Sequence, residues 1–223
     1  MPRSVLWIFI LTWLAFPTWA ETVSCEATNL RVNSPQLKYV DLTCEAVKQA
    51  EALFDQCNLP AIAEQVRINI VDELATGCVA LYHCDDSLIK VLEPSLMEVR
   101  REPEDAFAFL GIDAYYQSVI VHELAHSLFD DVPCPFAACV TASEYVAYTL
   151  QVMSLSPDAQ TMFAANSGLD REIFQDELSA MIYYMAPHLF AQKAWAHLSQ
   201  YDDPCTFIGQ IMDGTVLLDY EDL

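Results

Sequence analysis

Apolar and polar positions change their period along the chain, and the change separates two regions. Residues 37–56 carry apolar side chains at helical spacing, so we expect a helix there. Residues 66–71 alternate between apolar and polar positions, which predicts a strand with one buried face. Two shorter apolar runs at 78–83 and 88–92 predict two further strands.

Beyond residue 103 the apolar spacing is helical throughout. Pro103 precedes residues 104–110, for which we expect a short helix that Gly111 ends. Capping and helix-breaking residues divide the remainder into separate helices. We expect these at 113–130, 141–153, 157–167, 170–185, 187–200 and 204–212. A small N-terminal sheet with helices and an all-helical C-terminal half predict the α+β class.

The first twenty residues have the pattern of a targeting segment. Arg3 gives a basic start, residues 5–16 form an apolar run, and Ala20 is a small residue before a polar stretch. This pattern predicts a secretory signal peptide over 1–20 and a single domain over 21–223. A membrane anchor is the alternative, but a twelve-residue helix spans only about 18 Å. We therefore expect a periplasmic or extracellular protein that keeps no stable membrane anchor.

Export changes the interpretation of the eight cysteines. An even number of cysteines in an exported chain predicts disulfides, here four. The short spacings between Cys78 and Cys84, and between Cys134 and Cys139, favour two local bridges. A cysteine zinc site is the alternative, but the C-x-x-C pair typical of such sites does not occur in this sequence.

The charge excludes some functions without assigning one. The chain has 32 acidic and 10 basic residues and a formal net charge of −22. Nucleic acid binding requires clustered Lys and Arg, so we exclude it. The same acidity predicts that strongly acidic substrates are disfavoured, with rates that depend on salt.

The predicted helix 113–130 contains the motif H-E-x-x-H, from His122 and Glu123 to His126. Two histidines four residues apart lie on one helix face, so both imidazoles can reach one metal ion. Glu123 lies beside that face, where it can hold a water molecule and accept its proton. The flanking positions are uncharged, which an amphipathic helix with solvated histidines explains poorly.

This stretch resembles the active-site helix of zincin metallopeptidases. Zincins frame the motif with uncharged residues, as Val119, Ile120, Leu124, Ala125, Ser127 and Leu128 do here. The resemblance covers residues 119–148. It implies a zincin-like fold and one catalytic Zn²⁺ held by the two histidines and a third protein ligand.

Glu144 is the candidate for that third ligand. Gluzincins take it from a Glu on a following helix, and Glu144 stands 18 residues after His126. The alternative is that Glu144 only caps its helix, because Thr141-Ala142-Ser143-Glu144 matches the capping box. Gluzincins often carry an Asp four residues after the ligand, where this chain has Tyr148. His122 therefore needs another hydrogen-bond partner.

The resemblance implies a gluzincin-like peptidase that cleaves a peptide or protein substrate. Glu123 would act as general base beside the zinc ion, and a strand between residues 78 and 92 would pair with the substrate. The oxyanion needs a further donor. His188 and Tyr148 are the first candidates, beside His197, Tyr145, Tyr183 and Tyr184. The alternative is a catalytically silent, zincin-like envelope protein that binds a metal or a partner.

Overall fold

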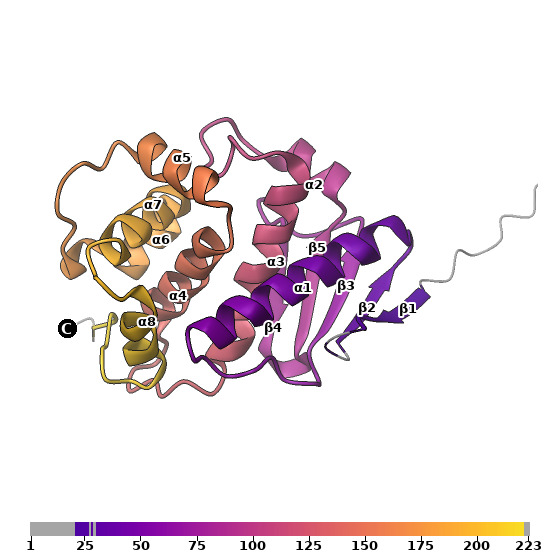
Figure 1. Ribbon diagram of the computed structural model, residues 1–223, viewed down its shortest axis with the longest axis horizontal. Helices are drawn as coiled ribbons and strands as arrows, with labels where there is room; N and C mark the ends of the chain where they lie inside the picture. Colours follow the sequence, from indigo (N-terminus) through magenta and orange to yellow (C-terminus); the bar gives the residue numbers. More distant parts are fainter. Residues whose placement is uncertain (1–20, 27, 29, 221–223) are drawn as a thin grey trace, which may run out of the picture.

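A computed structural model describes residues 21–26, 28 and 30–220, and the predicted signal peptide lies outside these residues. The α+β class is confirmed: a small mixed sheet precedes a mostly helical remainder (Figure 1). The strands are β1 (Glu21–Ser24), β2 (Arg31–Ser34), β3 (Arg67–Val71), β4 (Ala80–His83) and β5 (Leu88–Leu92). The helices are α1 (Lys38–Gln56), α2 (Pro94–Arg100), α3 (Ile112–Phe129), α4 (Val140–Met153), α5 (Pro157–Ser167), α6 (Ala180–Met185), α7 (Pro187–Leu198) and α8 (Pro204–Met212), with 3₁₀ turns η1 (Cys84–Asp86) and η2 (Gln175–Glu177).

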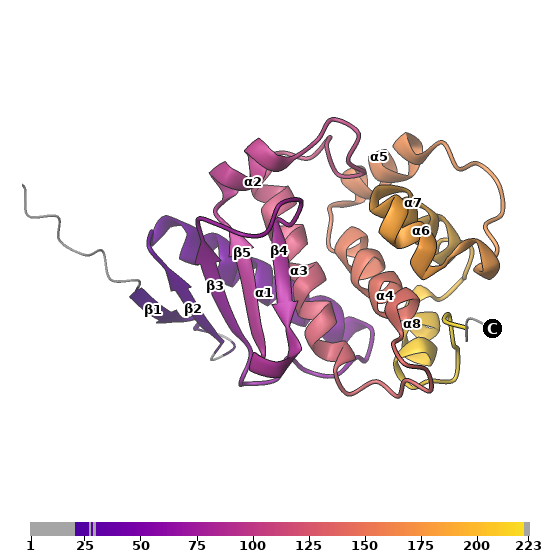
Figure 2. The same cartoon turned by 180° about the vertical axis from the view of Figure 1, so that it is seen from behind.

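The sheet has the order β1-β2-β3-β5-β4. Strands β2, β3 and β5 run parallel, whereas β1 and β4 pair antiparallel at the two edges. Ile68 and Ile70 of β3 and Ile89 and Val91 of β5 are buried, as expected for a sheet with one covered face. Helices α1 and α3 cover that face, and the strands lie in front of them when the molecule is viewed from behind (Figure 2).

The C-terminal half packs its helices on α4. Helix α3 contacts both α1 and α4, so it joins the sheet to the helical half. Helix α7 packs on α4, and α5 and α6 in turn pack on α7. None of the helices in the described part of the chain has the length and hydropathy that crossing a membrane requires.

One predicted helix is wrong, and a second is wrong in part. Residues 104–110 form successive turns, because Ala108 and Leu110 donate to carbonyls three residues earlier rather than four. The nearby helix is α2 instead, which Pro94 begins. Within the predicted helix 170–185, only η2 and α6 are helical. The sequence pattern did not predict strands β1 and β2.

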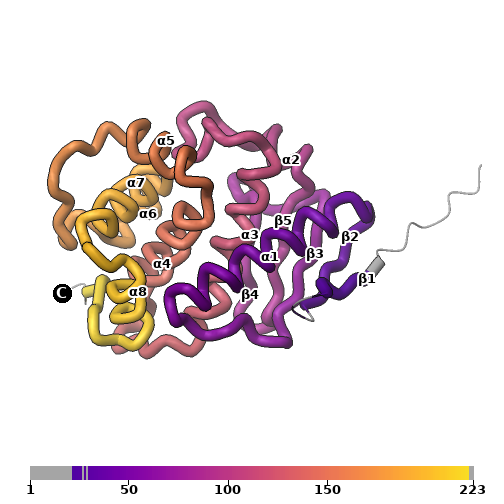
Figure 3. The backbone as a smooth tube through the Cα atoms, in the orientation of Figure 1, coloured from indigo at the N-terminus to yellow at the C-terminus, as the bar shows by residue number. Residues whose placement is uncertain are grey.

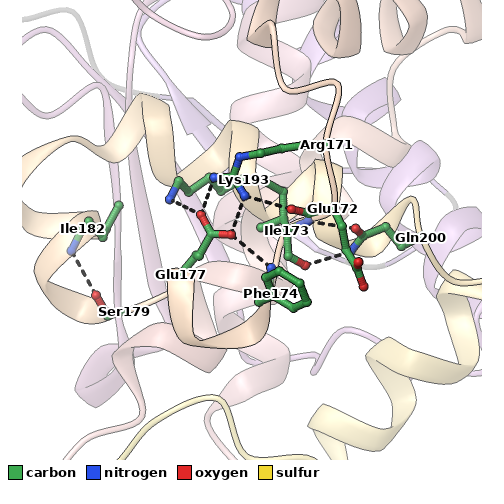
Figure 4. A network of polar contacts seen from close by, with 9 residues as sticks. All are labelled: Arg171, Glu172, Ile173, Phe174, Glu177, Ser179, Ile182, Lys193 and Gln200. Atoms are coloured by element: carbon green, nitrogen blue, oxygen red, sulfur yellow. Dashed lines mark hydrogen bonds and ion pairs between the residues drawn. The ribbon is translucent and has the colours of Figure 1, made fainter.

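Polar contacts pin the segment before α6 and prevent one continuous helix (Figure 4). The Glu177 carboxylate accepts from Arg171, from Lys193 of α7 and from the backbone N–H of Phe174. Gln200 bonds both backbone groups of Ile173. These contacts hold the segment before α6 against α7, so α6 begins as a separate helix.

Three disulfides crosslink the described chain, one of them locally and two over longer separations. Cys25 bonds Cys44 of α1, and Cys57 bonds Cys205 of α8 across a sequence separation of 148. The second bond ties the end of α1 to the start of α8, which lie together in the backbone trace (Figure 3). The third joins Cys134 to Cys139, as the spacing predicts. This disulfide content fits an exported protein.

The predicted bridge between Cys78 and Cys84 is wrong, and so is the count of four. Both cysteines are free thiols. They flank β4, whose four residues rise about 3.3 Å each, whereas a disulfide needs Cα atoms within about 7 Å.

Replacing Cys57 and Cys205 by serine should lower the free energy of unfolding by about 2–5 kcal/mol, because this crosslink closes the longest loop. Chemical denaturation without reductant measures the change. The control is the Cys78→Ser, Cys84→Ser double variant, which removes no bond and should differ by less than about 0.5 kcal/mol. Equal stability of the two double variants would contradict the assignment.

Candidate metal centre

Helix α3 carries the H-E-x-x-H residues through the middle of the molecule. It begins after Gly111, has Asp113 in its first turn, where a negative charge is favourable, and contains no Pro or Gly. Because α3 lies between α1 and α4 and packs on both (Figures 1 and 2), it is apolar almost all round. The buried side chains of α3 include Tyr116, Val119, Ile120, Val121, Leu124 and Ala125.

His122 and His126 of α3 meet Glu144 of α4. The two Nε2 atoms are 3.1 Å apart, and each lies 3.7 Å from a different oxygen of the Glu144 carboxylate. The potential ligand atoms of the three residues all lie within 4.8 Å of one another. A tetrahedral metal with bonds of about 2.0–2.1 Å separates its ligands by about 3.3 Å, close to these distances. The three side chains could therefore hold one metal ion.

Glu144 offers an oxygen without a protein partner. Within the described chain, its Oε2 is the buried side-chain polar atom for which no hydrogen bond is found. An unpaired buried carboxylate oxygen is costly, and a cation between the imidazoles and the carboxylate would remove that cost. The donor set of two imidazoles and one carboxylate therefore fits a metal ion.

Both imidazoles are held through their other nitrogen. His122 Nδ1 lies 3.1 Å from Oε1 of Gln151, and His126 Nδ1 lies 2.9 Å from the hydroxyl of Ser143. The ring of Tyr148 meets the His122 ring edge-on, with centroids 4.5 Å apart. These contacts direct both Nε2 atoms toward Glu144. Metal-binding histidines commonly have such partners.

Burial moves the pKa values of the cluster toward the neutral forms. It raises the pKa of Glu144 to about 7, which the Tyr183 hydroxyl opposes. It lowers the pKa of His126 to about 4 and that of His122 well below its ordinary value, with His126 adding repulsion at His122. Metal binding would therefore displace a proton mainly from Glu144.

Glu123 lies beside the cluster and is only 6% exposed. Burial is the first cause that raises its pKa, to about 8, and the Glu144 carboxylate is the second. The backbone N–H of Tyr82 in β4 opposes the rise by bonding Glu123. A carboxylate with this pKa can gain or lose a proton near neutral pH.

The cluster opens on a cleft of about 1470 Å³, larger than a small-molecule pocket needs. One wall is the edge strand β4 with the segment before it, and the floor is α3. The opposite walls come from α4, from the α6–α7 region and from the loop closed by the disulfide at Cys134. The strand expected between residues 78 and 92 thus lies at the sheet edge beside the cluster.

Glu144 does not cap its helix, contrary to the alternative from the sequence. Helix α4 begins at Val140, and two N–H groups of its first turn donate to Asp219 near the C-terminus. The two carboxylate oxygens of Asp219 accept from the backbone N–H groups of Thr141 and Ala142. Glu144 is therefore free to turn toward the histidines.

The remaining candidate donors divide into two groups. Tyr145 and His197 bond each other 2.9 Å apart and do not line the cleft. Tyr148, Tyr183, Tyr184 and His188 all line it. Burial, together with the Glu144 charge, raises the pKa of both Tyr148 and Tyr183, which keeps their hydroxyls protonated.

Sequence reasoning missed several residues at the site. Gln151 follows Glu144 by seven residues, so helical periodicity could have placed it on the same face. Ser143 and Tyr82 carry no local signal for their contacts. Asp219 lies 78 residues from the helix end that it caps, and nothing in the local pattern links the two.

The fold and the site together define an α+β protein with a buried His-His-Glu cluster able to hold a metal ion. The chain belongs to a family of unknown function (DUF6639), which it matches over residues 30–221. No curated protein and no solved structure matches the chain.

The cluster predicts a pH-dependent stability in metal-free protein. The carboxyls of Glu123 and Glu144 are protonated when folded but ionise near pH 4.5 when unfolded, so their contribution is lost as pH rises toward 8. The two histidines act in the opposite direction, but only below about pH 6.5. We expect the melting temperature of metal-free protein to fall between pH 6.5 and 8.

Zn²⁺ should reverse this trend, because higher pH deprotonates the ligand Glu144. The rise in melting temperature on adding Zn²⁺ should be larger at pH 8 than at pH 6.5. The Glu144→Gln variant should lose the zinc-dependent rise and show a flatter profile without metal. A zinc-dependent rise that is equal at both pH values would contradict these assignments.

Proposed function

We propose that the protein is an exported zinc-dependent peptidase. The observation that carries the proposal is the position of Glu123: a buried carboxylate beside a cluster of two histidines and Glu144, open to the same cleft as an edge strand. Two imidazoles and one carboxylate, with a position left for water, are a ligand set of catalytic zinc. His122, His126 and Glu144 would hold the ion.

Glu123 is the group suited to move a proton. When bound, Zn²⁺ would supply Lewis acidity, lowering the pKa of a water molecule at the open position toward about 7. The Glu123 carboxylate would accept a proton from water and return it to the nitrogen of the cleaved amide. Its pKa of about 8 lies near the neutral range in which a general base works best.

Tyr183 is the best placed donor for a developing oxyanion. Its hydroxyl faces Glu144 and stays protonated, because burial and that carboxylate raise its pKa. Tyr148 packs on the His122 ring, and His188 is exposed farther along the cleft wall, so both are weaker candidates. A protonated hydroxyl beside the ligands can donate to negative charge that appears there.

Edge strand β4 supports binding of an extended peptide. The N–H of Leu92 in the neighbouring segment donates to Val79, which fixes the alternation of hydrogen bonds along the antiparallel pair. The backbone groups of Ala80 and Tyr82 then point away from β5; the Tyr82 N–H bonds Glu123, and the Ala80 groups and the Tyr82 carbonyl face the free edge. A peptide can add to such an edge as a further strand.

A silent metal-binding protein is the alternative. A metal site without catalysis needs neither a buried carboxylate beside the ligands nor a cleft that reaches them. Both features are present, which favours the peptidase.

The Glu123→Gln variant should bind one zinc per chain but cleave peptides about 10²–10⁴-fold more slowly, because the amide cannot accept the proton. Zinc content and turnover of a peptide library measure the two effects. Glu172→Gln, an exposed change outside the cleft, is the control and should keep both. Wild-type protein without zinc, or full activity of Glu123→Gln, would refute the mechanism.

The charge of the cleft predicts a preference among peptides. Glu102, Asp105 and Asp130 line it besides the two carboxylates at the site. Arg100 is the single Lys or Arg among its described lining residues, and its guanidinium is bound to the backbone carbonyls of the segment before β4. Little positive charge is left for an acidic substrate.

Peptides that carry Lys or Arg should be cleaved on the order of tenfold faster than matched peptides with Glu or Asp at low salt. The ratio should shrink at high salt, because screening shortens the range of the cleft charge. Initial rates on paired peptides at two salt concentrations test this. Glu102→Gln should reduce the ratio. Equal, salt-insensitive rates would contradict it.

A further inference from the structure

Gln151 occupies a buried position behind His122, on the side away from Glu144. It lies on α4 and is 3% exposed. Its Oε1 lies 3.1 Å from His122 Nδ1, and its Nε2 lies 3.2 Å from the hydroxyl of Ser118, one turn before His122 on α3. The Ser118 hydroxyl lies 2.8 Å from the carbonyl oxygen of Tyr115. Three hydrogen bonds thus lead from a backbone carbonyl to an imidazole.

The direction of donation is fixed at each of these three hydrogen bonds. The Tyr115 carbonyl can only accept, so Ser118 must donate to it. The Ser118 oxygen then accepts from the amide NH₂ of Gln151, which leaves the amide oxygen facing His122. Because that oxygen can only accept, the proton of neutral His122 must sit on Nδ1.

We propose that Ser118 and Gln151 form a relay that fixes the His122 proton on Nδ1 and holds the Nε2 lone pair toward the metal position. The proposal rests on the metal site of the proposed function. Gln151 and Ser118 are positioning residues, because they act through His122. The opposite tautomer would place a proton on Nε2, where a metal ligand needs its lone pair.

His126 offers a comparison within the same cluster. Its Nδ1 partner is the Ser143 hydroxyl, which can donate or accept and therefore does not dictate where the proton sits. The amide of Gln151 can do so only because Ser118 fixes its orientation. The relay thus fixes the tautomer of His122, whereas the tautomer of His126 is free to be set by the bound metal.

A neutral relay suits a cluster that already buries Glu123 and Glu144. Gluzincins often place an Asp four residues after the ligand Glu, and Tyr148 stands there in this chain. A third carboxylate behind His122 would add repulsion in a site where burial already raises two carboxyl pKa values. Gln151 supplies the acceptor without that charge.

The test combines zinc affinity with the tautomer of His122. Gln151→Met keeps the volume and removes the acceptor, so zinc should bind about 10–100-fold more weakly, measured by competition with a chelator. In metal-free protein, ¹⁵N NMR should show Nδ1 protonated at His122 in the wild type and a mixture of tautomers in Gln151→Met. Gln151→Glu presents an acceptor oxygen in either protonation state and should restore the Nδ1 proton.

Ser118→Ala should weaken zinc binding and give a mixture of His122 tautomers. In the Gln151→Met background it should cause little further loss of zinc affinity, because both substitutions break the same series of hydrogen bonds. Gln200→Met is the control, the same substitution at a glutamine that does not line the cleft. It removes the hydrogen bonds of Gln200 to Ile173 and to the His197 carbonyl, and should lower stability without changing zinc affinity or the tautomer.

The outcomes separate the relay from the metal site. Wild-type zinc affinity and an unchanged tautomer in Gln151→Met would overturn the relay even if the protein is a zinc peptidase. A wild type that shows the Nδ1 proton but binds no zinc would refute the metal site and keep the relay as a structural device. An Nε2 proton in the metal-free wild type would overturn the relay directly.

Discussion

Helix α3 packs against α4 so that two imidazoles and a carboxylate meet away from solvent, and their ligand atoms lie within 4.8 Å of one another. Burial pushes each group toward its neutral form, as the raised pKa of Glu144 and the lowered pKa of His126 show. Such a cluster is costly unless hydrogen bonds or a cation satisfy it. The neighbouring elements supply the bonds and leave one carboxylate oxygen for the cation.

The start of α4 is the part of this arrangement that most depends on distant residues. Asp219 binds the N–H groups of Thr141 and Ala142, where the helix dipole also favours a negative charge. The next two residues, Ser143 and Glu144, are the ones that face the histidines. A carboxylate from the C-terminal segment thus fixes the helix turn that contributes a ligand. The disulfide between α1 and α8 anchors the same region to the sheet half.

Local spacing predicted the parts of the site that a single helix determines. His122 and His126 share a face because they are four residues apart, and the expected ranges of α3 and α4 agree with the structure within one residue. The prediction that Glu144 joins the two histidines came from a family resemblance, because the spacing alone was also compatible with a helix cap. Asp219 could not be predicted, since its partners are 78 and 77 residues away.

Other errors have the same physical origin. The run 170–185 has helical spacing, but Glu177 and Gln200 form long-range bonds that interrupt it. Cys78 and Cys84 are close in sequence, but the strand between them holds them apart. In both cases tertiary contacts or extended geometry override a short-range pattern, which is the limit of reasoning from spacing.

The structure shows where part of the negative charge of the protein lies. A formal net charge of −22 spread over the surface would say little about a reaction. Here carboxylates line the cleft, while Arg100 is bound to backbone carbonyls. At the buried cluster, one divalent ion would balance Glu144 and Glu123 together, and the neutral amide of Gln151 preserves that balance. The proposed metal therefore compensates the buried charge, and the uncompensated charge along the cleft walls is left to act on the substrate.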